Sequence, residues 1–292
     1  MKIGINSGVF YRFYDEFQTI FEAAKIGYDA LDYTLYMHEP PDSPLCRDGF
    51  EDYARELREF ADMSGISFCQ MHAPMLGYIG EVADEEPAME LTRRGFRIGQ
   101  ILGAPYMVIH PRHYRECIWG REKEKAMEYN LNMFRSLIPY AQEAGVKIGL
   151  ENMFGNDPDT GRLCPTTFSF AEEIEEYLEL LGRENFVVCL DTGHTNIVGV
   201  PPADFVRKVG PDLKLLHVHD NYVDLDQHLA PCLGTIDWEA FLQALRDVHY
   251  DGVFCYEPDG MFYNVKSKEQ LLNTAEYLFK TAKILTADGS CG

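Results

Sequence analysis

Short apolar runs rich in β-branched residues alternate along the chain with longer amphipathic stretches. A short run of this kind predicts a strand, and a longer stretch with apolar positions three or four residues apart predicts a helix. The pattern yields eight predicted strands. These are Lys2–Asn6, Ala30–Tyr36, Ser67–His72, Tyr106–His110, Lys147–Asn152, Phe186–Asp191, Leu213–Asp220 and Gly252–Glu257.

A helix-like stretch follows each predicted strand, and several of these stretches stop at a glycine. Glycine is common just past the C-terminus of a helix because it tolerates positive φ angles. Gly27, Gly65, Gly103 and Gly145 stand at such positions. The predicted helices are Phe13–Ile26, Glu51–Ser64, Pro87–Leu102, Glu122–Ala144, Thr167–Leu181, Pro202–Val209, Asp237–His249 and Ser267–Thr286.

The number of strand–helix units indicates the fold. Eight units in 292 residues give about 36 residues per unit, which is typical of a (β/α)8 barrel. A doubly wound open sheet is the alternative, but it usually carries a G-x-G-x-x-G turn after its first strand. Residues 6–10, NSGVF, lack that spacing. No linker or low-complexity tract interrupts the pattern, so we predict one α/β TIM-barrel domain over residues 1–292.

Polar residues stand where the last six predicted strands end. In a TIM barrel the carboxyl ends of the strands carry the functional residues, so these six should share one mouth. All six are of types that bind divalent metals. Three carboxylates gathered without a cation would resist joint ionisation, so we predict a metal site. The six residues are His72, His110, Glu151, Asp191, His217 and Glu257.

Other polar residues follow the fourth, sixth and seventh predicted strands. His194 lies three residues after Asp191, and Asp226 and His228 lie in the loop after the seventh strand. These three are candidates for binding an additional metal or the substrate. Arg112 and His113, after the fourth strand, are candidates for binding a phosphate or carboxylate of the substrate.

The charge of the chain narrows the range of partners. The sequence has 26 Lys+Arg against 47 Asp+Glu, a formal net charge of -21. Nucleic-acid-binding proteins usually present a basic face, and anionic membranes attract basic segments, so we expect neither partner. No apolar run reaches the roughly 18 residues of a membrane helix. The start of the chain lacks a signal-peptide pattern and the eight cysteines form no C-x-x-C pair, so we expect a cytoplasmic protein with free thiols.

The order and spacing of the strand-end motifs resemble those of the xylose isomerase-like TIM-barrel superfamily. This superfamily includes sugar phosphate isomerases and epimerases and also endonuclease IV. The resemblance runs from about Lys2 through the final helix. Its motifs are His72-Ala73-Pro74, His110-Pro111, Glu151-Asn152, Asp191-Thr192-Gly193-His194, His217-x-x-Asp220, Asp226-x-His228 and Glu257-Pro258.

The resemblance implies one of two metal arrangements. The ketose epimerase branch binds a single ion, and its two glutamate ligands also act as the acid/base pair. The matching ligands are Glu151, Asp191, His217 and Glu257. The endonuclease IV branch binds three zinc ions, and every ligand position has a match. The matches are His72, His110 and Glu151 for one ion, Glu151, Asp191, His217 and Glu257 for the second, and His194, Asp226 and His228 for the third.

The acidic loops favour the sugar branch, because a DNA repair enzyme must neutralise phosphates with Lys and Arg. The end of the seventh strand and the loop after it instead carry Asp220, Asp224 and Asp226. We therefore expect a divalent-metal-dependent isomerase or epimerase of a sugar or sugar phosphate. It would transfer a proton through a metal-stabilised enediolate, with Glu151 and Glu257 as the acid/base pair.

Three alternatives to this expectation stay open. A lyase or dehydratase of a keto-sugar shares the enediolate chemistry. An endonuclease IV-like trinuclear zinc phosphodiesterase would use the complete set of ligand matches. A protein that binds a sugar without turnover is the third. One ion is expected, with three in the endonuclease IV arrangement, and zinc, manganese, cobalt or magnesium would suit the ligands. The sequence is also compatible with a homo-oligomer.

Overall fold

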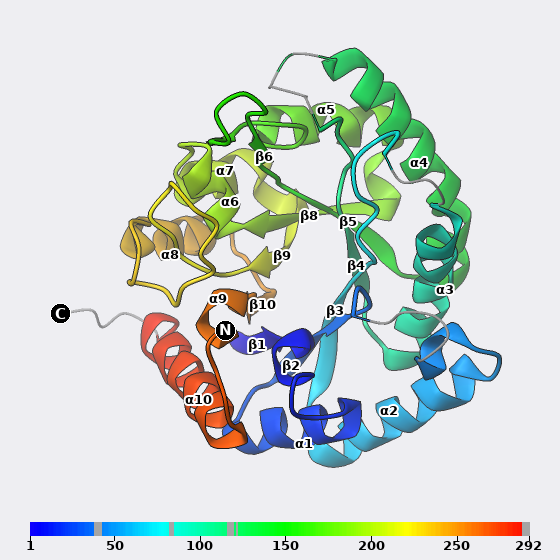
Figure 1. The fold of residues 1–292 in the computed structure, drawn as a ribbon, viewed down its shortest axis with the longest axis vertical. Helices are drawn as coiled ribbons and strands as arrows, with labels where there is room; N and C mark the ends of the chain where they lie inside the picture. Colours follow the sequence, from blue (N-terminus) through cyan, green and yellow to red (C-terminus); the bar gives the residue numbers. More distant parts are fainter. Residues whose placement is uncertain (38–42, 82–84, 116–119, 121, 288–292) are drawn as a thin grey trace.

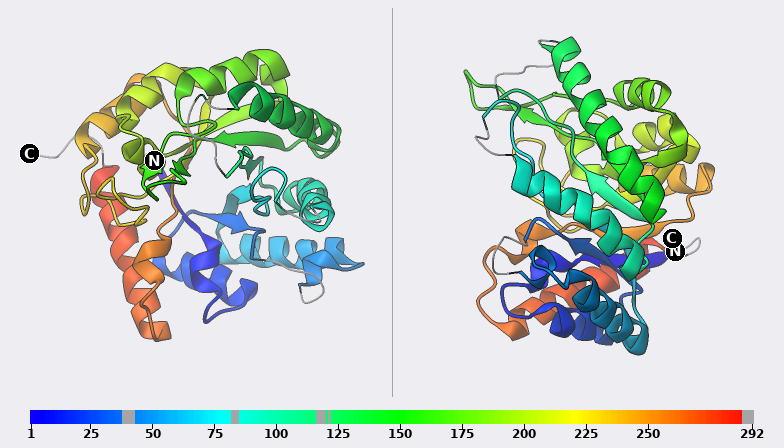
Figure 2. Two further views of the ribbon diagram at one scale, coloured as in Figure 1. Left: turned by 45° about the horizontal axis from the view of Figure 1, so that its top comes forward. Right: turned by 90° about the vertical axis from the view of Figure 1, so that its right-hand side faces the viewer.

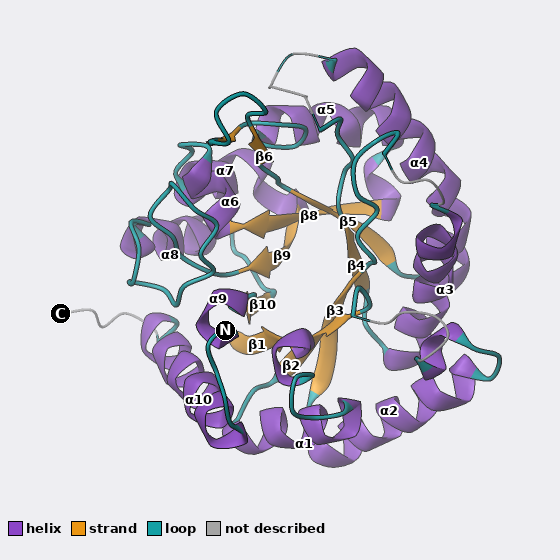
Figure 3. Cartoon of the chain, viewed as in Figure 1, coloured by secondary structure: helices purple, strands orange, loops and turns teal. Residues whose placement is uncertain are grey.

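Eight parallel strands form the inner sheet, in the order β10-β1-β2-β3-β4-β5-β8-β9. The computed structural model describes residues 1–37, 43–81, 85–115, 120 and 122–287. Figure 1 and Figure 3 show the strands in the centre with the helices around them. The strands are β1 (Lys2–Asn6), β2 (Ala30–Thr34), β3 (Ser67–His72), β4 (Tyr106–Ile109), β5 (Lys147–Glu151), β8 (Phe186–Asp191), β9 (Leu213–His217) and β10 (Val253–Tyr256).

The sheet closes where β9 meets β10. A parallel bridge joins Val218, just past β9, to Tyr256. The Val218 N–H donates to the Cys255 carbonyl at 2.8 Å, and the Glu257 N–H donates to the Val218 carbonyl at 3.3 Å. Together with the parallel ladders between the other neighbours, this confirms the predicted single-domain TIM barrel.

The outer layer consists of helices that alternate with the strands. Gly27, Gly65, Gly103 and Gly145 follow four of them, and all four have positive φ angles, as their place in the sequence predicted. Helices α1 and α10 pack side by side, so the last helix completes the outer ring (Figure 2). The main helices are α1 (Glu16–Ile26), α2 (Phe50–Ser64), α3 (Glu86–Leu102), α4 (Lys123–Ala144), α5 (Ala171–Leu181), α7 (Pro202–Val209), α8 (Trp238–Asp247) and α10 (Lys268–Leu285).

A small apolar cluster fills the barrel below its mouth. It consists of Val108, Val187, Cys189 and Leu215, with Tyr106 packed against it, and it draws on strands alone. Because side chains alternate along a strand, the residue two positions further on lies on the same inward face. The next inward residues along β4, β8 and β9 are therefore polar groups of the mouth, and this cluster forms their floor.

Several element boundaries differ from the predicted ones. Strand β2 ends at Thr34 rather than Tyr36, and β9 ends at His217 rather than Asp220. Helix α5 begins at Ala171 rather than Thr167. The cause is Phe168, whose φ of 68° lies in the left-handed region and prevents a helix from starting earlier.

Short elements at the mouth were not predicted. Helix α6 (Thr192–Ile197) begins directly after β8, and α9 (Asp259–Phe262) follows β10. Strands β6 (Gly155–Asn156) and β7 (Leu163–Cys164) form an antiparallel hairpin after β5. These elements are too short to show a hydrophobic period, which explains why the sequence pattern missed them.

The described helices and cysteines bear on two further expectations. No helix within the described ranges combines the length and the apolar character that crossing a membrane requires. The six cysteines in the described part of the chain form no disulfide bond. Cys117 and Cys291 lie outside the described residues.

Glu173 generates a prediction about stability. Its Oε2 accepts a 2.7 Å hydrogen bond from the Phe168 N–H, and burial raises the pKa of this carboxyl to about 7. The native state therefore holds a proton that the unfolded chain releases, so the free energy of unfolding falls as pH rises from 4.5 to about 7. Glu173→Gln keeps the acceptor without the charge. We expect it to raise the Tm at pH 8 by at least about 2 °C and to leave it nearly unchanged at pH 4.

Thermal unfolding followed by circular dichroism at the two pH values measures this difference. Glu172→Gln is the matched control, because Glu172 is the exposed neighbour on the same helical turn. An equal Tm change for Glu173→Gln at both pH values would show that folding does not raise the pKa of this carboxyl.

Candidate metal centre

Four strand-end side chains meet at the barrel mouth. Glu151, Asp191 and His217 are the last residues of β5, β8 and β9, and Glu257 directly follows β10. All four are buried, and one potential ligand atom from each lies within 4.8 Å of the others. The structure therefore brings together the four residues that the sequence predicted as ligands of one ion.

A glycine in β5 lets the strands beneath this group approach one another closely. Gly149 stands two residues before Glu151 on the same face of β5. A Cβ atom at Gly149 would lie 2.6 Å from Leu215 Cδ1, so any larger residue would displace the floor of the mouth. Glycine at this position thus lets β5 and β9 approach closely enough for Glu151 to contact His217.

Glu151 is the most heavily contacted carboxylate of the mouth. His217 Nδ1 lies 2.8 Å from its Oε1, and His110 Nε2 lies 2.9 Å from its Oε2. Burial alone would raise its pKa, but the positive charges on His217 and His110 outweigh burial and hold the pKa of Glu151 well below its usual range. A cationic partner therefore stabilises the ionised form of this carboxylate.

Glu257 shows the opposite shift. Burial raises its pKa to about 7, and repulsion from Glu151 adds to the rise, although the charge of His217 opposes it. His217 Nδ1 lies 3.6 Å from Glu257 Oε2, so this one nitrogen faces both glutamates. The two carboxyl groups are thus neighbours whose environments push their proton affinities apart.

Asp32 is a residue of the site that sequence reasoning missed. Its Oδ2 accepts from His217 Nε2 at 3.0 Å and from Gln70 Nε2 at 3.2 Å. This contact orients the His217 ring so that Nδ1 faces the glutamates, which is how a carboxylate usually fixes a metal-binding imidazole. A charged residue in the middle of the apolar run ALDYT was the available signal.

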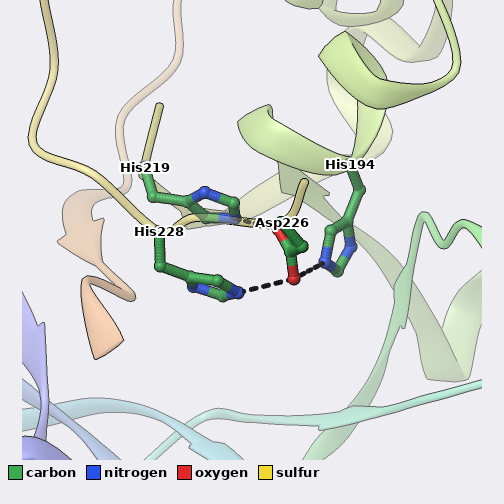
Figure 4. Close-up of side chains that lie close together, drawn as sticks. All are labelled: His194, His219, Asp226 and His228. Carbon is green, nitrogen blue, oxygen red and sulfur yellow. Dashed lines mark hydrogen bonds and ion pairs between the residues drawn. The ribbon is translucent and has the colours of Figure 1, made fainter. Parts of the chain in front are cut away.

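A second group of potential ligands adjoins the first. His194, His219, Asp226 and His228 each offer an atom within 4.8 Å of the others (Figure 4). His228 Nε2 lies 2.8 Å from Asp226 Oδ2, and His194 Nε2 lies 3.8 Å from the same oxygen. The Nδ1 atoms of these two histidines donate to backbone carbonyls, of Glu257 at 2.7 Å and Asn152 at 2.8 Å. Both Nε2 atoms are therefore held toward Asp226.

His219 is the second residue that sequence reasoning missed. Its ring stacks on that of His228, with centroids 3.8 Å apart, and its Nε2 lies 2.9 Å from Asp191 Oδ2. A Cβ at Gly193 would lie 1.9 Å from His219 Cε1, so only glycine leaves room for this ring. The available signal was its position two residues after His217, which places both on the inward face.

The remaining predicted ligands lie on the other side of Glu151. His72 and His110 form a third group with Glu151. The Nδ1 of His72 donates to the Ala73 carbonyl at 2.8 Å, and its Nε2 lies 3.1 Å from His110 Nε2. Two ring nitrogens this close need a shared proton or a cation between them.

Arg112 and His113 occupy different environments. Arg112 is 2% exposed, and its guanidinium donates to the carbonyls of Gly77 and Tyr78 and pairs with Glu85. This internal pairing weighs against Arg112 as a ligand for a substrate phosphate. His113 lines a pocket beside the mouth, and its Nδ1 is buried with no hydrogen-bond partner in the described part of the chain.

Comparison with known proteins identifies the fold family. The family model for xylose isomerase-like TIM barrels matches residues 20–280. An uncharacterised protein of Methanocaldococcus jannaschii is 32% identical over 180 residues, which are 61% of this chain and 57% of that protein. The D-psicose 3-epimerase of Enterocloster bolteae is 32% identical over 124 residues, covering 42% of this chain and 37% of that enzyme. The matched part thus spans less than two thirds of either relative.

A solved structure extends the likeness to the whole chain. The crystal structure of the IOLI protein with a bound zinc atom has a TM-score of 0.76 and covers 100% of both chains at 20% sequence identity. At this identity the likeness shows the shared fold.

The contact between Asp32 and His217 generates a prediction about metal affinity. Asp32→Asn removes the charge that orients the imidazole, so we expect the affinity for Mn²⁺ or Zn²⁺ to fall about 10–100-fold. Isothermal titration of the metal-stripped protein measures this change. Asp29→Asn is the control, because Asp29 directly precedes the same strand and accepts from the Ile3 N–H, away from His217. Unchanged affinity in folded Asp32→Asn would refute the orienting role.

Proposed function

Because the chain belongs to the family of xylose isomerase-like TIM barrels, we propose that it is a divalent-metal-dependent isomerase or epimerase of a small sugar. The observation that carries this proposal is the buried group of three carboxylates and one imidazole at the barrel mouth. The similarity to a D-psicose 3-epimerase supports the reaction class. Two of the carboxylates face the same imidazole, that of His217. Glu151 ends β5 and Glu257 follows β10, and β8 and β9 lie between these two strands around the barrel.

The donor set fits a divalent cation. Glu151, Asp191, His217 and Glu257 would hold the ion, and a mixture of carboxylate and imidazole ligands suits manganese, cobalt, zinc or magnesium. The bound zinc of the IOLI protein supports a metal in this fold. When bound, a divalent cation supplies Lewis acidity that stabilises negative charge on the neighbouring oxygens of a sugar.

The two glutamates perform the proton transfers in this proposal. One carboxylate accepts the proton from the carbon next to the substrate carbonyl, and the other returns a proton from the other side. Return to the opposite face of the same carbon gives epimerisation, whereas return to the neighbouring carbon gives isomerisation. Asp32 keeps the His217 ring in place during this cycle through the contact at 3.0 Å. A lyase acting on a keto-sugar would begin with the same proton abstraction.

The second ligand group favours one alternative, a trinuclear phosphodiesterase resembling endonuclease IV. His194, Asp226 and His228 occupy one group, as the resemblance implied. Two described arginines in the loop after β4 do not favour DNA binding, however. Arg112 pairs with Glu85, and Arg115 pairs with Glu81 at 2.7 Å. Paired arginines do not provide the free charge that phosphate backbones require, so the sugar reaction is the better-supported function.

Exchange of a substrate proton with solvent tests the proposal directly. The metal-loaded protein in D2O should incorporate deuterium next to the carbonyl of D-psicose, D-fructose or an inosose, as measured by NMR. Glu257→Gln should lower the exchange rate by about 100-fold or more, because it removes a proton-transferring group. Glu239→Gln, an exposed substitution on α8, is the control and should retain the rate. Absence of exchange with every sugar, together with nicking of duplex DNA at abasic sites, would overturn the proposal in favour of the phosphodiesterase.

A further inference from the structure

A pocket of about 240 Å³ opens beside the metal centre. Its walls come from the loops that follow β3, β4 and β5. His110 belongs to both the pocket and the group around Glu151, and the pocket residue Phe154 packs its ring against His194, with centroids 4.9 Å apart. The pocket is therefore continuous with the site at which a sugar would react, although it contributes no carboxylate to that site.

The pocket walls are mainly apolar. Met75, Leu76, Tyr78, Met153 and Phe154 all contribute to them. The volume lies below the roughly 300–1,000 Å³ of sites that enclose drug-sized ligands. The space therefore suits one small group at the end of a substrate rather than a second large ligand.

Among the described residues that line the pocket, none offers a free positive charge. Arg112 is the one arginine or lysine among the residues that line it, and its guanidinium is bound to Glu85 and to the Gly77 and Tyr78 carbonyls. Burial lowers the pKa of His113 to about 4, so this imidazole is neutral at neutral pH. A phosphate dianion placed here would lose its hydration without gaining a counter-charge, which is strongly unfavourable.

The His113 ring adds to the apolar character of the wall. It packs edge-on against Tyr78, with the ring centroids 5.1 Å apart. Its Nδ1 is buried and has no hydrogen-bond partner among the described residues, so this nitrogen offers no hydrogen bond to a ligand in the pocket.

We propose that this pocket receives the end of the sugar remote from the reacting carbonyl, and that this end is an uncharged, mainly apolar group. A deoxy terminus or the aglycone of a keto-glycoside has this character, whereas a sugar phosphate does not. The inference rests on the proposed function and narrows its substrate class to unphosphorylated sugars.

A series of sugars that differ at one end tests the inference. The probes are 6-deoxy-D-fructose, D-fructose and D-fructose 6-phosphate, and methyl and phenyl 3-keto-β-D-glucosides form a second series. Each is measured by deuterium exchange and by isothermal titration of the metal-loaded protein. We expect the deoxy ketose or the phenyl glucoside to exceed the phosphate by about tenfold or more in kcat/KM and in affinity. The series that shows the preference distinguishes a deoxy terminus from an aglycone.

The outcomes separate this inference from the proposed function. Exchange that is equal or faster with the phosphate would overturn the inference and leave the isomerase or epimerase standing. Exchange with none of the sugars would overturn both.

Two variants test the pocket itself. Met75 is 51% exposed at the pocket, so Met75→Lys adds a cation there with little risk to folding. It should raise the kcat/KM of the phosphate relative to the deoxy ketose by about tenfold. Met63→Lys, at an exposed position on α2, adds the same charge elsewhere and should leave the ratio unchanged. An unchanged ratio in Met75→Lys would show that the sugar end does not reach this pocket.

Discussion

The balance of charge at the barrel mouth is the constraint on which the rest of this structure depends. Three carboxylates, those of Glu151, Asp191 and Glu257, are buried within a few ångströms of one another, and Asp32 lies behind them. Such a group is stable only if positive charge is distributed among the carboxylates. The surrounding imidazoles face these carboxylates, with His217 Nδ1 2.8 Å from Glu151 Oε1 and His219 Nε2 2.9 Å from Asp191 Oδ2. A site that binds a divalent ion is the simplest resolution of this charge.

Local features of the barrel follow from that constraint. Gly149 removes a side chain so that β5 and β9 can bring Glu151 and His217 together. Helix α6 begins immediately after Asp191, whose Oδ1 accepts from the His194 N–H at 2.7 Å. That arrangement fixes one carboxylate oxygen and leaves the other to face His219. These side chains are thus held in place by the backbone or by a neighbouring charged side chain. The walls of the adjoining pocket do not hold them, so the residues of those walls can vary without moving the candidate metal ligands.

The sequence pattern predicted the barrel because strands and long helices have clear periods. It also predicted nine residues that gather at the mouth. Six stand where an apolar run stops, and three lie in the segments that follow such strand ends. Asp32 escaped the prediction because it lies inside a strand rather than at its end, and His219 because only its spacing from His217 marks it. The internal pairing of Arg112 with Glu85 joins two loops distant in sequence. No local pattern encodes such a contact, so the character of the pocket emerged only from the three-dimensional structure.

The most direct test of this account is to locate the metal in crystals of the metal-loaded protein by anomalous diffraction at the absorption edge of the bound ion. The account predicts an ion bonded to Glu151, Asp191, His217 and Glu257, at the roughly 2.0–2.2 Å typical of carboxylate and imidazole ligands for zinc. Absence of an anomalous peak between these four residues at saturating metal would contradict it.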